Sequence, residues 1–118
     1  MSLELSGPEA SREFIEAARP DLTCVHLTMP VEPGPVEPKR LSALRTRLGL
    51  SDANLVVGCF GLVTREKGIE KVARAVARVA EIHPEVRLLL AGAVADADWL
   101  DATLRRAAIR GRTVIAGR

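Results

Sequence analysis

The chain has 118 residues, 47% of them apolar, which suits a single domain with a hydrophobic core and excludes a disordered tail. Only 3% are aromatic, so leucine, valine, isoleucine and alanine must form the core, which favours parallel strands packed against alanine-rich helices. Lys and Arg number 17 against 15 Asp and Glu, and the charges are interspersed, which argues against a nucleic-acid-binding protein.

The N-terminal segment reads as a helix, a short strand and a linker. Ser6 has the pattern of a helix cap, and the helix stops at Pro20. Residues 23–29 have strand character, and the prolines of residues 30–38 hold the following connector extended. We therefore predict a connecting segment and a separate domain, over residues 1–37 and 38–118.

From Pro38 onward, helices and strands alternate. The first helix ends at Gly49, a typical C-terminal cap, and a second runs from about residue 66 to 82. Asp96 or Asp98 caps the third helix, which ends at Gly111. The predicted strands cover residues 55–60, 86–91 and 113–116.

The order strand, helix, strand, helix, strand predicts an α/β fold. Crossovers of this length make the strands parallel, with right-handed connections. The strand over residues 55–60 is apolar on both faces, as expected for a central strand. We expect one half of a three-layer Rossmann-like parallel sheet, which further strands beyond Arg118 would complete.

The loop from Gly61 to Gly68 is the candidate anion site. It follows the carboxyl end of a strand and leads into a helix N-terminus, where free N–H groups and the helix dipole favour anions. Gly61 lets a ligand approach the backbone, and Lys67 supplies a mobile charge suited to a diphosphate, with Arg65 as a second candidate. The alternative is a simple turn glycine beside a solvated lysine, because the loop matches neither the Walker motif nor the Gly-x-Gly-x-x-Gly fingerprint.

Other side chains suggest no metal centre and no membrane span. His26 and His83 lack metal-ligand neighbours at useful spacing. Cys24 and Cys59 read as buried free thiols in a reducing cytoplasm, and Trp99 as a packing residue. With no signal peptide and no apolar run of roughly 20 residues, we expect a cytoplasmic protein, and peripheral membrane contact stays open.

The run VVGCFGLVTREKGIEKVARAVARV, followed by HPEVRLLLAG, resembles the start of the C-terminal domain of group-one glycosyltransferases (family four). Their pattern has a Gly-rich turn, a Lys-Gly pair opening a helix, a Pro-ended helix and a strand ending in Gly. The corresponding residues here are Gly61, Lys67, Gly68, Pro84 and Gly92. Residues 1–37 are similar to the interdomain crossover of these enzymes, which have the GT-B architecture of a pair of facing Rossmann-like domains.

The resemblance implies retaining transfer of a sugar from a nucleotide-sugar donor, without a metal or a separate cofactor. By the same resemblance, Lys67 would contact the donor diphosphate and Gly61 would lie against it through its backbone. Gly92 would lie on the nucleotide side of the cleft. The acceptor, a glycan, a lipid or a small molecule, is not indicated by these residues.

The sequence departs from the family pattern in ways that affect its expected activity. Leu62 stands where many members carry a diphosphate-binding Arg. The paired glutamates of the family and its acceptor-binding N-terminal domain are absent. We therefore expect a fragment with no catalytic residues and no transferase activity of its own, which self-associates through an unpaired sheet edge or by exchange of its N-terminal elements.

Two other readings remain. The first is a nucleotide-sugar epimerase or a phosphorylase-like enzyme of GT-B architecture, because such enzymes also use Rossmann-like half-domains. The second is a non-catalytic α/β interaction module. A receiver domain is disfavoured because no predicted strand ends in Asp. Nucleotide binding discriminates, since an interaction module would ignore uridine, guanosine and adenosine diphosphates alike.

Overall fold

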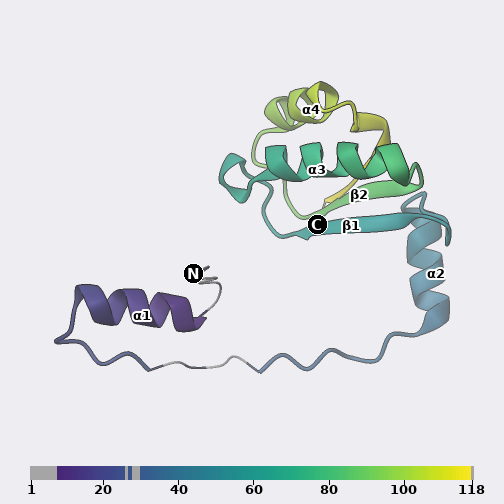
Figure 1. Ribbon diagram of the computed structural model, residues 1–118. Helices are drawn as coiled ribbons and strands as arrows, with labels where there is room; N and C mark the ends of the chain where they lie inside the picture. Colours follow the sequence, from purple (N-terminus) through teal and green to yellow (C-terminus); the bar gives the residue numbers. More distant parts are fainter. Residues whose placement is uncertain (1–7, 26, 28–29, 118) are drawn as a thin grey trace. The chain divides into compact units, whose positions relative to one another are not determined.

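Figure 1 shows the computed structural model, which describes residues 8–25, 27 and 30–117. The chain divides into two compact units, residues 1–35 and 36–118, and each is described by itself. In the first unit, α1 spans Pro8–Ala18, in agreement with a helix that stops before Pro20. The predicted cap Ser6 lies outside the described residues.

The strand predicted over residues 23–29 is not formed by its described residues. Residues 23–25 and 27 belong to no helix or strand, while residues 26, 28 and 29 lie outside the described residues. A strand needs a hydrogen-bonded neighbour, and β-prone composition alone does not supply one. Cys24 and Cys59 are both free thiols, but each is half-buried rather than buried as predicted.

The second unit contains helices and strands in the predicted alternating order, which confirms the α/β fold. Short 3-10 turns precede α3 and β3. The elements are α2 (Pro38–Arg47), β1 (Leu55–Phe60), the turn Arg65–Lys67, α3 (Ile69–Ile82), β2 (Val86–Ala91), α4 (Ala97–Arg106), the turn Arg110–Arg112 and β3 (Thr113–Gly117).

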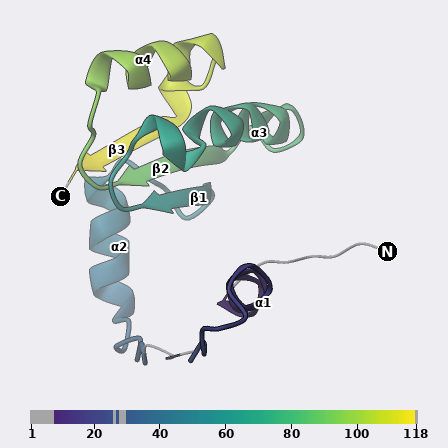
Figure 2. The same cartoon turned by 90° about the vertical axis from the view of Figure 1, so that its left-hand side faces the viewer.

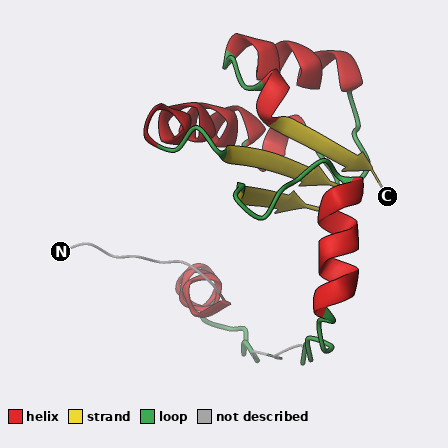
Figure 3. Cartoon of the chain, turned by 90° about the vertical axis from the view of Figure 1, so that its right-hand side faces the viewer, coloured by secondary structure: helices red, strands yellow, loops and turns green. Residues whose placement is uncertain are grey.

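The three strands form one all-parallel sheet of order β1-β2-β3, and all three arrows in Figure 3 point the same way. The prediction that residues 55–60 form a central strand is therefore wrong for the described residues. β2 is the central strand and β1 lies at an edge. Each crossover steps to the next position in the same direction, and this stepping leaves the first strand outermost.

Both α3 and α4 cover the same face of the sheet, as Figures 1 and 2 show. Right-handed crossovers that step in one direction place their helices on one side. The described residues thus form two layers of the three that were predicted. α2 has no buried residue, and its leucines Leu41 and Leu44 are exposed.

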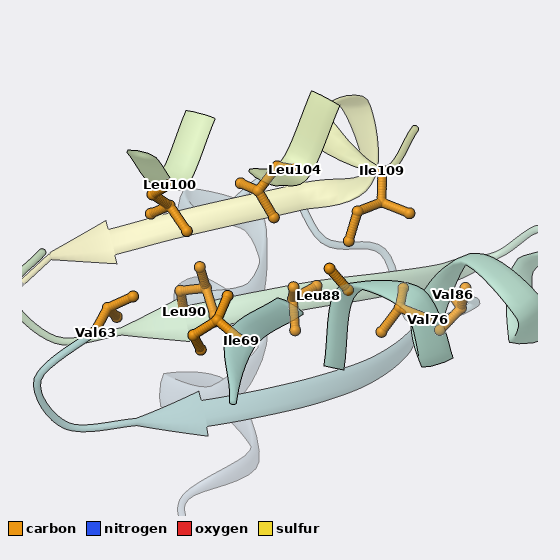
Figure 4. Close-up of a cluster of buried hydrophobic side chains, with 10 residues drawn as sticks. Val63, Ile69, Val76, Val86, Leu88, Leu90, Leu100, Leu104 and Ile109 are labelled. Carbon is orange, nitrogen blue, oxygen red and sulfur yellow. The ribbon is translucent and has the colours of Figure 1, made fainter. Parts of the chain in front are cut away.

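The core lies between this helical layer and the sheet (Figure 4). Alternate residues of β2 point into it, because successive strand side chains face opposite sides. A fully buried leucine or valine stabilises the fold by about 1.5–3 kcal/mol. The buried cluster consists of Val63, Ile69, Ala73, Val76, Val86, Leu88, Leu90, Leu100, Leu104 and Ile109.

Two helix ends follow the same local motif. After α2, Leu50 N–H donates to Arg45 O over 2.8 Å and Gly49 N–H donates to Thr46 O over 3.0 Å. This is a Schellman motif with Gly49 in the left-handed conformation at φ 70°, so the predicted Gly49 cap is confirmed. Leu50, which follows this glycine, is buried.

The end of α4 was predicted at Gly111, but the helix stops at Arg106. Ile109 N–H donates to Leu104 O and Ala108 N–H to Arg105 O, which forms the same motif. Ala108 occupies the left-handed position with φ 58° and allows Ile109 to enter the core. The sequence carries alanine where this motif prefers glycine, and so the helix end was missed.

Candidate functional site

The loops that follow β1 and β2 run side by side at the carboxyl ends of the strands. Gly61 N–H donates to Ala91 O over 2.9 Å, and Val63 N–H donates to Ala93 O over 2.8 Å. Ala95 N–H returns a bond to Val63 O over 3.1 Å, so the parallel pairing continues past the sheet. Val63 is buried beneath this crossing. The candidate anion loop is therefore fixed at its start.

The crossing of the two loops leaves room only for glycine at position 92. A Cβ at Gly92 would lie 1.9 Å from the carbonyl oxygen of Gly61, and the φ angle of 154° is one that other residues rarely adopt. Packing against the Gly61 backbone is therefore sufficient to account for glycine at position 92, and no ligand is needed to explain it. The role of Gly92 on the nucleotide side of a cleft stays a prediction.

Lys67 lies close to Gly61. Its Nζ is 3.5 Å from the position that a Cβ on Gly61 would occupy, and the side chain is exposed. Residues Arg65–Lys67 form a 3-10 turn, in which Lys67 N–H donates to Thr64 O over 3.3 Å, so the loop folds back towards the end of β1. Within the described part of the chain, the ammonium forms no ion pair.

α3 begins at Ile69, two residues after Lys67, and not at Glu66 as predicted. Gly68 has a left-handed φ of 72° and separates the 3-10 turn from the α-helix, which starts at Ile69. Gly68 O accepts from Lys71 N–H and Val72 N–H, and no side chain caps the first turn. The N-terminus of α3 and Lys67 are therefore two residues apart along the chain, and each favours negative charge.

Arg65 is engaged elsewhere. Its guanidinium donates to Asp96 Oδ2 over 2.9 Å and lies 5.4 Å from the centroid of the Trp99 ring. Asp96 Oδ1 accepts from Trp99 N–H, so Asp96 caps α4 as predicted. The backbone N–H of Trp99 and then the side chain of Arg65 lower the pKa of Asp96. The diphosphate-binding role of Arg65 stays a prediction.

Sequence reasoning missed this cluster of Arg65, Asp96 and Trp99. Arg65 and Asp96 are 31 positions apart, so no local spacing connects them. The prediction that Trp99 is a packing residue is confirmed, because it is half-buried against the core. Leu62 stands where many of the glycosyltransferases that the sequence resembles have Arg, and it is 51% exposed.

Two surface hollows lie outside the predicted loop. One of about 250 Å³ lies between α3 and α4, where the buried hydroxyl of Thr103 has no hydrogen-bond partner. The other, of about 380 Å³, lies beside β3 and is lined by Ile115 and Arg110 among others. Neither is lined by Gly61, Lys67 or Gly92.

Searches for metal-binding groups and membrane spans give no candidate in the described residues. No group of at least three His, Cys, Asp or Glu side chains there could hold a metal ion. In residues 8–25, 27 and 30–117, no helix combines the length and apolar character that a membrane span needs.

A scan against models of protein families, a search of curated proteins and a search of solved structures find no match for this chain.

Proposed function

We propose that this chain forms the donor-diphosphate part of a nucleotide-sugar-binding domain from a retaining glycosyltransferase. The observation that carries the proposal is the position of Lys67 Nζ over Gly61, at the carboxyl end of a parallel strand. Ligands of open α/β sheets bind beyond these strand ends. The N-terminus of α3, which no side chain caps, begins two residues after Lys67 and offers further backbone N–H groups.

The proposed chemistry is stabilisation of a leaving diphosphate. During glycosyl transfer, negative charge develops on the diphosphate as the bond to the sugar breaks. A cation and helix N–H groups that are already in place stabilise this charge without reorganising. Lys67 would contact the diphosphate, and the backbone of Gly61 would lie against it. Arg65 would reach it only by leaving Asp96, an exposed pair whose loss costs little.

The same proposal implies a second domain, a further layer of helices and a further strand. A GT-B enzyme would supply a second Rossmann-like domain for the acceptor and a third layer of helices on the open face of this sheet. In a complete Rossmann-like sheet a fourth strand would pair with β1, because the usual strand order places the first strand in the middle. We place the protein in the cytoplasm, where nucleotide-sugars serve as donors, with peripheral membrane contact for a lipid acceptor.

Calorimetric titration tests the diphosphate site directly. Uridine, guanosine and adenosine diphosphates are titrated into the wild-type chain, and at least one is expected to bind. Lys67→Ala should weaken that binding by roughly 10- to 100-fold, because a bond to a charged group is lost. Lys71→Ala is the matched control, since Lys71 is also exposed but lies within α3. Equal losses in both variants would contradict the proposal.

A transfer assay distinguishes the activity expected of this chain from that of a complete enzyme. The 118-residue chain should transfer no sugar from any nucleotide-sugar, since it lacks the paired glutamates of the resembling family. Detectable transfer would refute this expectation. Complete indifference to all three nucleotides would favour the interaction-module alternative, whereas binding without transfer is also compatible with an epimerase or phosphorylase-like parent.

A further inference from the structure

A surface hollow between α3 and α4 carries polar and charged side chains from both helices. The two helices lie side by side on one face of the sheet (Figures 1 and 2). Glu70 and Arg74 are four residues apart on α3 and share one side of that helix. Thr103 and Arg106 are three residues apart and share one side of α4. These four residues and Ala107 line the hollow, which therefore lies between the facing sides of two helices.

The hydroxyl of Thr103 is a buried polar group without a partner. Thr103 is 4% exposed, and its Oγ1 forms no hydrogen bond with any residue that the structure describes. A buried hydroxyl without a hydrogen bond costs free energy, and buried polar groups of native proteins nearly always have a partner. Since Thr103 lines the hollow, a molecule bound there is placed to supply one. The volume of about 250 Å³ is far above the roughly 10–15 Å³ that a single water needs.

Arg74 and Arg106 bring unpaired positive charge to the same hollow. Both are exposed, and neither forms an ion pair with a residue that the structure describes. Arg106 lies in the last turn of α4 and Glu70 in the first turn of α3, where each complements a helix dipole. The dipole does not account for Arg74, which lies in the second turn of α3. Two guanidinium groups and a hydroxyl together form a donor set suited to an oxyanion.

We propose that this hollow binds a phosphate group, either as free phosphate or as part of a phosphate monoester. A single arginine satisfies both oxygens of a planar carboxylate, whereas phosphate has oxygens in more directions and suits donors from two helices. Thr103 donates to the same group, and Glu70 accepts from a protonated phosphate oxygen. The inference is independent of the proposed function, because neither Gly61 nor Lys67 lines this hollow.

Nuclear magnetic resonance titration with inorganic sodium phosphate tests the site. The titration is made in Lys67→Ala, which removes the cation of the proposed strand-end site, and sodium chloride keeps the ionic strength constant. The amide signal of Thr103 should shift and saturate. Arg74→Ala and Arg106→Ala should each weaken binding by about tenfold or more, because a bond to a charged group is lost. Arg78→Ala is the matched control, since Arg78 is an exposed arginine of α3 that does not line the hollow.

Thr103→Val tests the hydroxyl itself. Without phosphate, the thermal midpoint of this variant should equal or exceed that of the wild-type chain, because a methyl group replaces an unpartnered buried hydroxyl. Added phosphate should raise the wild-type midpoint, because a ligand of the folded state stabilises it, and should raise the variant's midpoint less. A midpoint that falls without phosphate would show that the hydroxyl already has a partner, which would overturn the proposal.

The same titration with glycerol phosphate distinguishes the two sources of the phosphate group. Tighter binding of the ester than of inorganic phosphate assigns the hollow to an organic phosphate, and equal or weaker binding assigns it to free phosphate. The proposal is also overturned if neither compound shifts the signal of Thr103, or if Arg78→Ala weakens binding as much as Arg74→Ala does.

Discussion

Gly92→Ala tests the crossing of the two strand-end loops, on which the candidate site depends. The new Cβ would lie 1.9 Å from the carbonyl oxygen and 2.5 Å from the carbonyl carbon of Gly61. Carbon and oxygen approach to about 3.3 Å at best, so the loop must move by more than an ångström. That movement breaks the bonds from Gly61 N–H to Ala91 O and from Val63 N–H to Ala93 O.

The expected loss of unfolding free energy follows from these contacts. Two hydrogen bonds contribute about 1 kcal/mol each, and the strained backbone adds about 1–3 kcal/mol. We therefore expect a loss of about 3–5 kcal/mol, measured by urea denaturation followed by circular dichroism.

Two other glycines provide controls for the Gly92 experiment. Gly68 has φ 72° but no atom within 4 Å of an added Cβ, so Gly68→Ala should cost only about 1–2 kcal/mol. Gly111 has an open Cβ position and no such φ, so Gly111→Ala should be nearly neutral. If Gly92→Ala costs no more than Gly68→Ala, the two loops do not cross as described.

The remaining predictions concern the core, a helix end and the carboxylates. Leu90→Ala should cost about 2–5 kcal/mol of unfolding free energy, because Leu90 is fully buried, whereas Leu62→Ala should cost under about 0.5 kcal/mol in the same urea titration. Ala108→Gly should raise the thermal midpoint by relieving a left-handed alanine, and a lowered midpoint would contradict the Schellman motif. Folding lowers the pKa of Asp96, mainly through the N–H of Trp99, and that of Asp101 through Arg105 and then Arg110. The folded state then binds fewer protons than the unfolded state, so these carboxylates stabilise it above about pH 4 and lose their effect at lower pH. In Asp96→Asn, the urea midpoint should therefore fall less steeply as the pH is lowered, and an unchanged pH dependence would refute the role of Asp96.

The elements of the second unit could be predicted because their signals are local. Helical spacing of apolar residues, the capping position of Asp96 and the glycine after α2 are all visible within one or two turns. The alternation of these elements then dictates parallel strands. The order of the elements and the all-parallel pairing are accordingly as predicted.

What could not be predicted depends on distant contacts or on unfavourable local choices. The apolar sequence of β1 indicates a buried centre, but its neighbours decide its place, and only β2 is present among the described residues. Arg65 contacts Asp96 and Trp99 across 31 positions or more, so no motif reveals that it is engaged. Ala108 takes a conformation that its type disfavours, and this hid the end of α4.

For the loop, sequence reasoning selected Gly61, Lys67 and Gly92, and the structure brings these residues to one end of the sheet. Their proximity has two parts with different causes. Gly92 contacts Gly61 because the backbones cross, which is a packing requirement. Lys67 lies beside Gly61 and forms no ion pair with any residue that the structure describes, and this residue therefore carries the functional proposal.

Nuclear magnetic resonance titration with nucleoside diphosphates tests the central claim most directly. On addition of uridine, guanosine or adenosine diphosphate to labelled wild-type chain, the amide signals of Gly61, Lys67, Gly68 and Ile69 should shift together. The shifts should vanish in Lys67→Ala and persist in Lys71→Ala. Unchanged signals at millimolar nucleotide, or shifts confined to the groove around Thr103, would show that the strand end does not bind a diphosphate.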